Sequence, residues 1–168
     1  MTVADLEVLY DYGYWANRHL CQVLSPLPPS DFTKSVAGSY GSIRNTLVHA
    51  MSAEWGWLDR CGGPERGPSL NADDFPDLES VVVAWRKVEG YVRAFLEALN
   101  DEDLDRVIDF QLGSGGQRSM RMGELLHHST VHGAHHRGQG ALLLRLLGHA
   151  PGDFDILFYY AEKAGVAS

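Results

Sequence analysis

The chain of 168 residues has few cysteines and no long apolar run, and several classes of protein are disfavoured by these absences. Its two cysteines, Cys21 and Cys61, form no Cys-x-x-Cys motif and no disulfide framework, as is typical of a reducing cytoplasm. No stretch approaches the ~18 consecutive apolar residues of a membrane-spanning helix. Residues 1–7 lack a basic segment followed by an apolar run, so we expect no signal peptide and a cytoplasmic location.

Positive charge is also scarce. Aspartate and glutamate number 22 against 14 lysines and arginines, which gives a formal net charge of −8. Nucleic acids and anionic lipid surfaces are bound through clustered basic side chains, and no basic stripe is visible. We therefore expect neither nucleic-acid binding nor membrane binding.

Motifs of two common enzyme classes are missing as well. The absence of a Gly-x-Ser-x-Gly motif argues against a serine hydrolase. No Gly-x-Gly-x-x-Gly follows a predicted strand, and the glycines at Gly113 and Gly115 fall in a predicted hairpin turn, where they indicate phosphate binding only weakly.

The sequence does contain long amphipathic patterns with an apolar period near 3.6, which predict helices. The predicted helices cover residues 3–24, 42–60, 77–99 and 122–147, with a short turn at 30–32 and a final helix or packed tail at 153–164. Ser42 and Asp153 are expected as N-caps and Gly148 as the residue after a helix end. Residues 106–121 predict a hairpin that turns at Gly113–Gly116. We therefore expect an all-α fold, a four-helix bundle with a small β-hairpin before the last long helix, as one domain over residues 1–168.

Five of the eight histidines fall within residues 127–136, inside the last long helix. Side chains four residues apart lie on one helical face, so His132 and His136 aim two imidazoles at one point. Such a pair commonly supplies two ligands of a metal site. Leu125 and Leu143 lie on the same stripe, which places the pair toward the bundle interior.

Two histidines rarely suffice for a metal, and His49 on another predicted helix is the leading candidate for the third ligand. His128-x3-His132 and His132-x2-His135 also satisfy helical geometry, so spacing alone leaves the choice of pair open. His127 and His135 are expected on the flank of the helix. The alternative is a set of structural histidines without a metal, which would need a hydrogen-bond partner for each buried imidazole.

Three segments resemble the DinB superfamily, the four-helix metalloproteins that include the YfiT-like proteins. They are Tyr12–Asn17, Ser42–His49 and His128–Gln139, the last of which carries the fairly specific sequence His-Arg-Gly-Gln after a His-x3-His pair. Leu147–Pro151 followed by Asp155 also fits the ending of the family. The resemblance covers most of the chain.

The resemblance implies a divalent metal ion, commonly zinc or nickel, held by three histidines that fall on His49, His132 and His136. It also implies a frequent homodimer, for which some of the four tryptophans are candidate interface anchors. The family includes transferases and isomerases that use low-molecular-weight thiols such as bacillithiol or mycothiol. It also includes damage-inducible, stress-response proteins whose induction indicates no chemistry.

Further side chains are candidates for the surroundings of the site. His128 is predicted either to support the ligands or to be structural, and Gln139 either to orient water or substrate or to pair with backbone. Arg137 is expected to pair with Glu54 or with a substrate carboxylate.

On the predicted first helix, Trp15 and Asn17 either line the mouth of the site or serve in helix packing and at the surface.

Three protein ligands leave one metal position open, which is the pattern of catalytic zinc. In a thiol transferase that position would take a small thiol and keep it deprotonated at neutral pH. A hydrolase would want a nearby carboxylate base, and no acid lies between His132 and His136. Because imidazole must be neutral to ligate, metal binding is expected to weaken as the pH falls through the histidine range.

These observations favour a metal-dependent enzyme of the thiol S-transferase type, with a small thiol or another small molecule as its partner. The catalytic residues are unassigned, and whether the chain is an enzyme stays open. The alternatives are a non-catalytic metal- or ligand-binding protein, a metal-dependent hydrolase, and a bundle with a purely structural metal.

Overall fold

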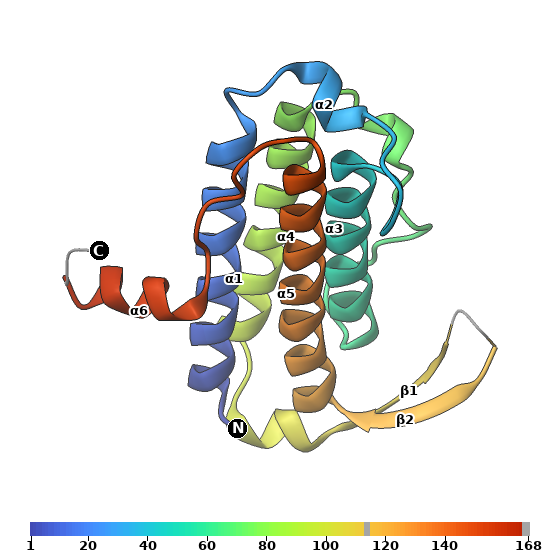
Figure 1. Cartoon of the computed structure of the whole chain (residues 1–168). Helices are drawn as coiled ribbons and strands as arrows, with labels where there is room; N and C mark the ends of the chain where they lie inside the picture. Colours follow the sequence, from blue (N-terminus) through green and yellow to red (C-terminus); the bar gives the residue numbers. More distant parts are fainter. Residues whose placement is uncertain (113–114, 166–168) are drawn as a thin grey trace.

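The structure is a computed structural model that describes residues 1–112 and 115–165. Its long helices lie side by side as a bundle (Figure 1), and they are α1 (Val3–Leu24), α3 (Ile43–Arg60), α4 (Leu78–Glu97) and α5 (Met122–Leu146). The shorter elements are α2 (Pro29–Thr33), α6 (Ile156–Lys163), the 3₁₀ turns η1 (Ala72–Asp74) and η2 (Asp101–Asp105), and strands β1 (Val107–Gln111) and β2 (Gln117–Arg121). The predicted helical bundle with a hairpin before the last long helix is confirmed. Among the described residues, no helix has both the length and the apolar character needed to cross a membrane.

The hairpin extends from the end of the bundle where α5 begins (Figure 1). β1 and β2 pair antiparallel, with Val107 opposite Arg121 and Gln111 opposite Gln117. Phe110 is the strand residue that is buried, and its ring meets the Trp57 ring edge-on at a centroid distance of 5.4 Å. The predicted turn includes residues 113–114, which lie outside the described residues.

Local signals explain most helix ends. Ser42 caps α3 by accepting a hydrogen bond from Asn45 N at 3.1 Å, and Gly148 follows α5 with a left-handed φ of 87°, both as predicted. The prediction of Asp153 as the last N-cap is wrong, because Asp155 takes that place. Tyr12 of α1 donates a hydrogen bond to the Phe154 carbonyl at 3.2 Å, so α6 begins after that residue.

The core fills the space between the long helices with leucine-sized side chains. Leu6 and Leu20 of α1, Leu47 of α3 and Leu125 and Leu143 of α5 are all at most 1% exposed. Each such side chain stabilises the fold by roughly 1.5–3 kcal/mol relative to an exposed one. The apolar stripe of α5 therefore predicted correctly that Leu125 and Leu143 are buried.

The connection between α3 and α4, residues 61–77, runs back along α3. Both helices point the same way (Figure 1), so the chain must return the length of α3, which at 18 residues is about 27 Å. Progressively later loop residues pair with progressively earlier helix residues: Arg66 N with Asp59 Oδ2 (3.2 Å), Leu70 N with Ser52 Oγ (3.0 Å), and Asp73 Oδ1 with Arg44 Nη2 (2.7 Å). This long loop therefore packs along one face of α3.

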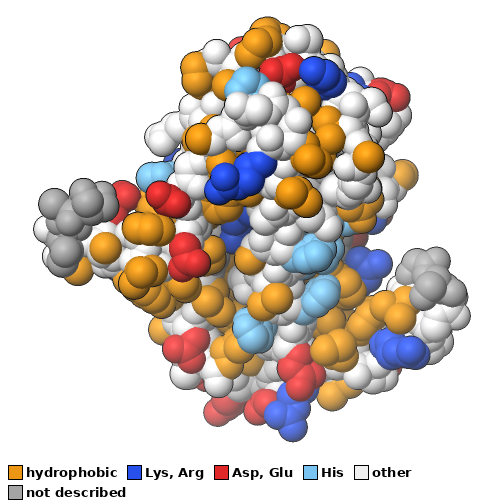
Figure 2. Space-filling model, viewed as in Figure 1, with side chains coloured by type: hydrophobic (Ala, Val, Ile, Leu, Met, Phe, Trp, Pro, Cys, Tyr) orange, Lys and Arg blue, Asp and Glu red, His pale blue; other side chains and the backbone are white. Residues whose placement is uncertain are grey.

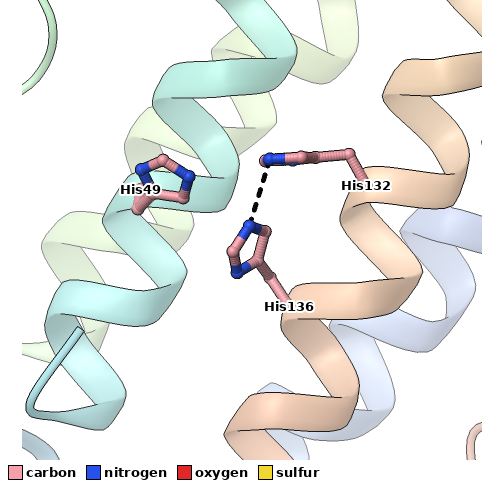
Figure 3. Close-up of side chains that lie close together, drawn as sticks. All are labelled: His49, His132 and His136. Carbon is pink, nitrogen blue, oxygen red and sulfur yellow. Dashed lines mark hydrogen bonds between the residues drawn. The ribbon is translucent and has the colours of Figure 1, made fainter. Parts of the chain in front are cut away.

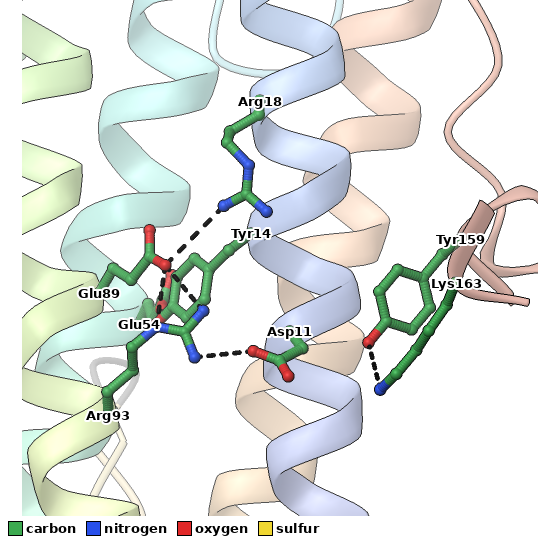
Figure 4. Close-up of polar contacts among 8 residues, drawn as sticks. All are labelled: Asp11, Tyr14, Arg18, Glu54, Glu89, Arg93, Tyr159 and Lys163. Atoms are coloured by element: carbon green, nitrogen blue, oxygen red, sulfur yellow. Dashed lines mark hydrogen bonds and ion pairs between the residues drawn. The ribbon is translucent and has the colours of Figure 1, made fainter. Parts of the chain in front are cut away.

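A carboxyl group inside the bundle joins three helices. Glu54 of α3 accepts hydrogen bonds from the Tyr14 hydroxyl of α1 and, at 2.8 Å, from Trp85 Nε1 of α4. Burial raises the pKa of Glu54, and these two hydrogen bonds act in the opposite direction. Close to it, Arg93 pairs with Asp11 and with Glu89 at the surface between α1 and α4 (Figure 4).

We expect Glu54→Ala to lower the free energy of unfolding by about 3 kcal/mol, because it leaves two buried donors without acceptors and opens a cavity. Glu54→Gln keeps an acceptor and the volume, so its expected loss is about 1 kcal/mol or less. Urea unfolding followed by tryptophan fluorescence at pH 7 measures both. Equal losses for the two variants would contradict a role based on hydrogen bonding.

Candidate metal centre

Two neighbouring helices place three histidines against one another. His49 comes from α3, and His132 and His136 come from one face of α5 (Figure 3). The Nε2 atoms of His132 and His136 lie 3.1 Å apart. One ring nitrogen from each of the three residues lies within 4.8 Å of the other two. The three histidines expected to form a site are thus together.

This arrangement fits a divalent ion. Zinc–imidazole bonds are about 2.0–2.1 Å long, so two nitrogens on one ion are at most about 4.2 Å apart. The His132 and His136 nitrogens already satisfy that bound, and the His49 nitrogen lies within 4.8 Å of theirs, so a small side-chain rotation would be enough to meet it. Three imidazoles suit zinc, nickel, copper or iron, and the donor set alone does not choose among them.

Gln139 holds one of the three rings. Its Oε1 accepts a hydrogen bond from His136 Nδ1 at 2.7 Å, which leaves His136 Nε2 without a proton and free to ligate. Ser39 Oγ donates to the same Oε1 at 2.7 Å, and Gln139 Nε2 meets His135 Nε2 at 2.8 Å. These partners are side chains, so the alternative in which Gln139 pairs with backbone is wrong. A hydrogen bond to the second nitrogen of a ligand commonly fixes its orientation.

Tyr40 is a site residue that the sequence did not reveal. Its ring stacks on His49 with centroids 4.0 Å apart, and its hydroxyl lies 2.9 Å from His49 Nε2. Tyr40 belongs to the loop before α3, where no helical period indicates which side chains turn inward. The left-handed Ser39, with φ of 47°, is part of the turn that brings Tyr40 back over the helix.

The remaining histidines of α5 lie at the solvent-exposed edge of the site. Figure 2 shows histidine side chains gathered on the surface over the middle of α5. His127 and His135 are exposed, as expected for the flank. His128 is exposed too, and its ring packs edge-on against Trp57 at 4.9 Å. His128, which by spacing could also have paired with His132, therefore lies outside the three-histidine cluster.

Arg137 points away from the three histidines and into the contact between α5 and α1. It is 4% exposed, its guanidinium lies 5.2 Å from the centre of the Tyr12 ring, and it donates to Asn17 Oδ1 at 3.3 Å. The predicted ion pair with Glu54 is wrong, because no nitrogen–oxygen contact within 4.0 Å joins them. The Glu54 oxygens already accept from the tyrosine and the tryptophan described above.

Trp15 does not line the mouth of the site. It is buried between α1 and α6, where its ring meets Tyr159 at 5.9 Å and its Nε1 donates to Glu162 Oε2 at 2.9 Å. Of the two interpretations given for Trp15 and Asn17, packing is correct for Trp15. Asn17 is the acceptor for Arg137.

The three imidazoles are neutral at physiological pH. Burial lowers the pKa of His49 and of His132 to about 4 each, and the neighbouring His136 lowers both further. Burial also lowers the pKa of His136, while its hydrogen bond to Gln139 acts in the opposite direction. Neutral imidazole is the form that binds metal, so the site is prepared for ligation.

A cavity of about 460 Å³ opens beside His49 and His132 and follows α3. Its walls are α3, Tyr40 from the loop before that helix, and the loop after it. Among the described residues that line it, none is an aspartate or a glutamate. A separate cavity of about 620 Å³ lies between α1, α2 and α4, and none of the three histidines lines it.

The fold and the site define a class of protein: a four-helix bundle in which two facing helices bring three histidines together as a candidate metal centre. The chain belongs to the DinB family, whose family model matches residues 1–164. It is 28% identical over 170 residues to Protein DinB of Bacillus subtilis (strain 168), covering 93% of this chain and 96% of that protein. Its fold resembles the crystal structure of a DinB-like protein from Bacillus cereus ATCC 10987, with a TM-score of 0.72 and 22% identity over 90% of this chain and 97% of that one. The resemblance found in the sequence is confirmed.

Proposed function

We propose that this protein binds one divalent ion, zinc or nickel, through His49, His132 and His136 and uses it to activate a small thiol toward an electrophile. The observation that carries the proposal is the meeting of three neutral imidazoles, two of which, His49 and His132, line a cavity that has room for a small molecule. A divalent ion held by neutral ligands supplies uncompensated positive charge, which favours an anionic partner such as a thiolate.

Gln139 and Tyr40 position the rings of two of the three histidines. Gln139 fixes the His136 ring, and Tyr40 covers His49 and keeps a hydroxyl at the edge of the site. The thiol comes from outside the chain. Cys21 lines the separate cavity between α1 and α4, and Cys61 is fully buried in the core.

The composition of the cavity favours thiol chemistry over hydrolysis. A metal-dependent hydrolase normally places a carboxylate near the ion as a general base. The described lining has no carboxylate, and the Tyr40 hydroxyl lies 2.9 Å from His49 Nε2. A thiolate needs no such base once the positive charge of the ion has lowered its pKa.

The test is the absorption spectrum of the cobalt-substituted protein titrated with 2-mercaptoethanol. We expect a sulfur-to-cobalt charge-transfer band in the near ultraviolet and thiol-dependent turnover of a model electrophile. If saturating thiol leaves the spectrum unchanged and no turnover appears, the transferase proposal fails and a non-catalytic binding protein becomes the better explanation. His127→Ala is a matched control that removes an exposed histidine of the same helix.

We further propose that the protein forms a homodimer through the outer face of α5. Val131, Leu142 and Leu146 are between 55% and 58% exposed there, an apolar surface that association would cover. Light scattering at micromolar concentration is expected to give twice the mass of the chain, and Leu142→Glu is expected to shift it to the monomer. A monomeric mass for the unmodified protein would refute the dimer.

A further inference from the structure

Two guanidinium groups meet over one residue of α3 in the cavity beside the histidines. A Cβ atom built on Gly56 would lie 2.8 Å from Arg66 Nη1 and 3.3 Å from Arg60 Nη1. Both arginines line the cavity that begins at His49. Glycine at position 56 therefore leaves the space in which these two groups come together.

Hydrogen bonds to α3 hold Arg66, a residue of the loop after that helix, in this position. Its Nη1 donates to Ser52 O at 3.0 Å and to Ser52 Oγ at 3.2 Å, while its backbone N–H donates to Asp59. Arg60 donates from Nη1 to Gly56 O at 2.8 Å, and its guanidinium lies 4.8 Å from the centre of the Trp57 ring. The two positive groups are thus fixed from two different segments of the chain.

Neither guanidinium group forms an ion pair with a carboxylate in the part of the chain that the structure describes. Arg44 and Arg93, for example, each form an ion pair within 4.0 Å of a carboxylate oxygen. Among the described residues, neither Arg60 nor Arg66 forms one. Burial lowers the pKa of Arg66, the Arg60 charge lowers it further, and Asp59 opposes them. In a chain with 22 acidic and 14 basic residues, a pair of arginines without a carboxylate indicates an anion supplied from outside.

The distance between the two arginines and the histidines sets the length of a ligand that would reach both. Ser52 and Gly56 follow His49 on α3 by three and seven residues, which correspond to about 5 and 10 Å along the helix axis. An anionic group at the arginines would therefore stand about 5–10 Å from the histidine end of the cavity. That is the length of a small molecule with a short carbon chain.

We propose that the cavity binds a small organic acid, with its carboxylate at Arg60 and Arg66 and its other end at His49 and His132. Arginine forks match the geometry of a carboxylate, and the wall formed by Trp57, Val48 and Leu70 accepts a carbon chain. The inference rests on the proposed function only in assigning the acid as a substrate of the metal site. The carboxylate site itself depends on the arginines.

Calorimetric titration of the metal-free protein with hexanoate and with the neutral analogue hexanamide tests the inference. We expect hexanoate to bind about tenfold more tightly, since a charge-assisted hydrogen bond contributes enough for that ratio. Arg66→Gln and Arg60→Gln are expected to abolish the preference. Arg145→Gln, which removes an exposed charge at the end of α5, is expected to keep it.

Arg66 also supports the loop, so thermal unfolding checks that its variant still folds. Arg60→Gln serves as the second variant, because among the described residues the Arg60 side chain hydrogen-bonds only within its own helix. The inference is overturned if hexanoate and hexanamide bind with equal affinity, or if the preference for hexanoate survives in both arginine variants. It is also overturned if Arg145→Gln loses that preference to the same extent. Tighter binding of methyl phosphate than of hexanoate would overturn the choice of a carboxylate. The proposed function is tested separately, because 2-mercaptoethanol carries no carboxylate and the titration here contains no metal.

Discussion

Replacing His132 and His136 together by alanine is expected to reduce the bound divalent metal from about one ion per chain to background. A single remaining imidazole, His49, cannot hold an ion against dialysis, since stable sites need three or four protein ligands. The measurement is metal analysis by mass spectrometry after dialysis, with circular dichroism to show that the helices are intact.

The matched control is the double variant His127→Ala/His128→Ala. It removes the same number of imidazoles from the same helix, and both residues are exposed and outside the cluster. We expect this control to keep its metal. If the His132/His136 variant keeps wild-type metal content, or if both variants lose it equally, the three histidines are not the site.

The sequence predicted the helices well because their ends are signalled locally. Ser42 caps α3 and Gly148 ends the turn after α5, and both signals lie within a few residues of the helix they bound. The start of α6 was mispredicted because a tertiary contact decides it. Asp153 and Asp155 are equally good caps by composition, and the hydrogen bond from Tyr12 to the Phe154 carbonyl selects the second.

The histidine cluster was predictable in part, for the same reason. His132 and His136 share a face of one helix, and helical geometry alone places them together. Helical geometry cannot pair His49 with them, because the two helices meet through packing that the sequence does not display. His49 was the leading candidate for the third ligand, the resemblance to a family assigned it, and the structure brings the three rings together.

The surroundings of the site were the least predictable part. Tyr40 and Arg66 come from loops, where side-chain direction follows no period, and their positions depend on the course of the chain before and after α3. Arg137 was expected to pair with Glu54, but Tyr14 and Trp85 donate to that carboxyl group instead. Competition of this kind is decided by three-dimensional packing, which spacing along the chain does not encode.

The affinity for metal is expected to hold from pH 7.5 to about 5.5 and to collapse as the pH approaches 4. The pKa values of His49 and His132 are lowered from 6.5 to about 4, so protons do not compete with the ion until that range. Two histidines with ordinary pKa values would lower the affinity about a hundredfold by pH 5.5, whereas His49 and His132 are expected to lower it less than about twofold. The window is therefore lower than the ordinary histidine range that the sequence alone suggested.

The metal-free fold is expected to respond at a higher pH than the metal site. Between pH 6.5 and 4 the unfolded chain binds protons at His49 and His132 while the folded chain does not, so folding stability falls as the pH falls through this range. Chelator competition at half-unit steps of pH measures the affinity, and thermal unfolding of the metal-free protein measures the stability. A steep loss of metal already between pH 7 and 6 would show that the ligands titrate as exposed histidines, which would contradict the lowered pKa values of His49 and His132.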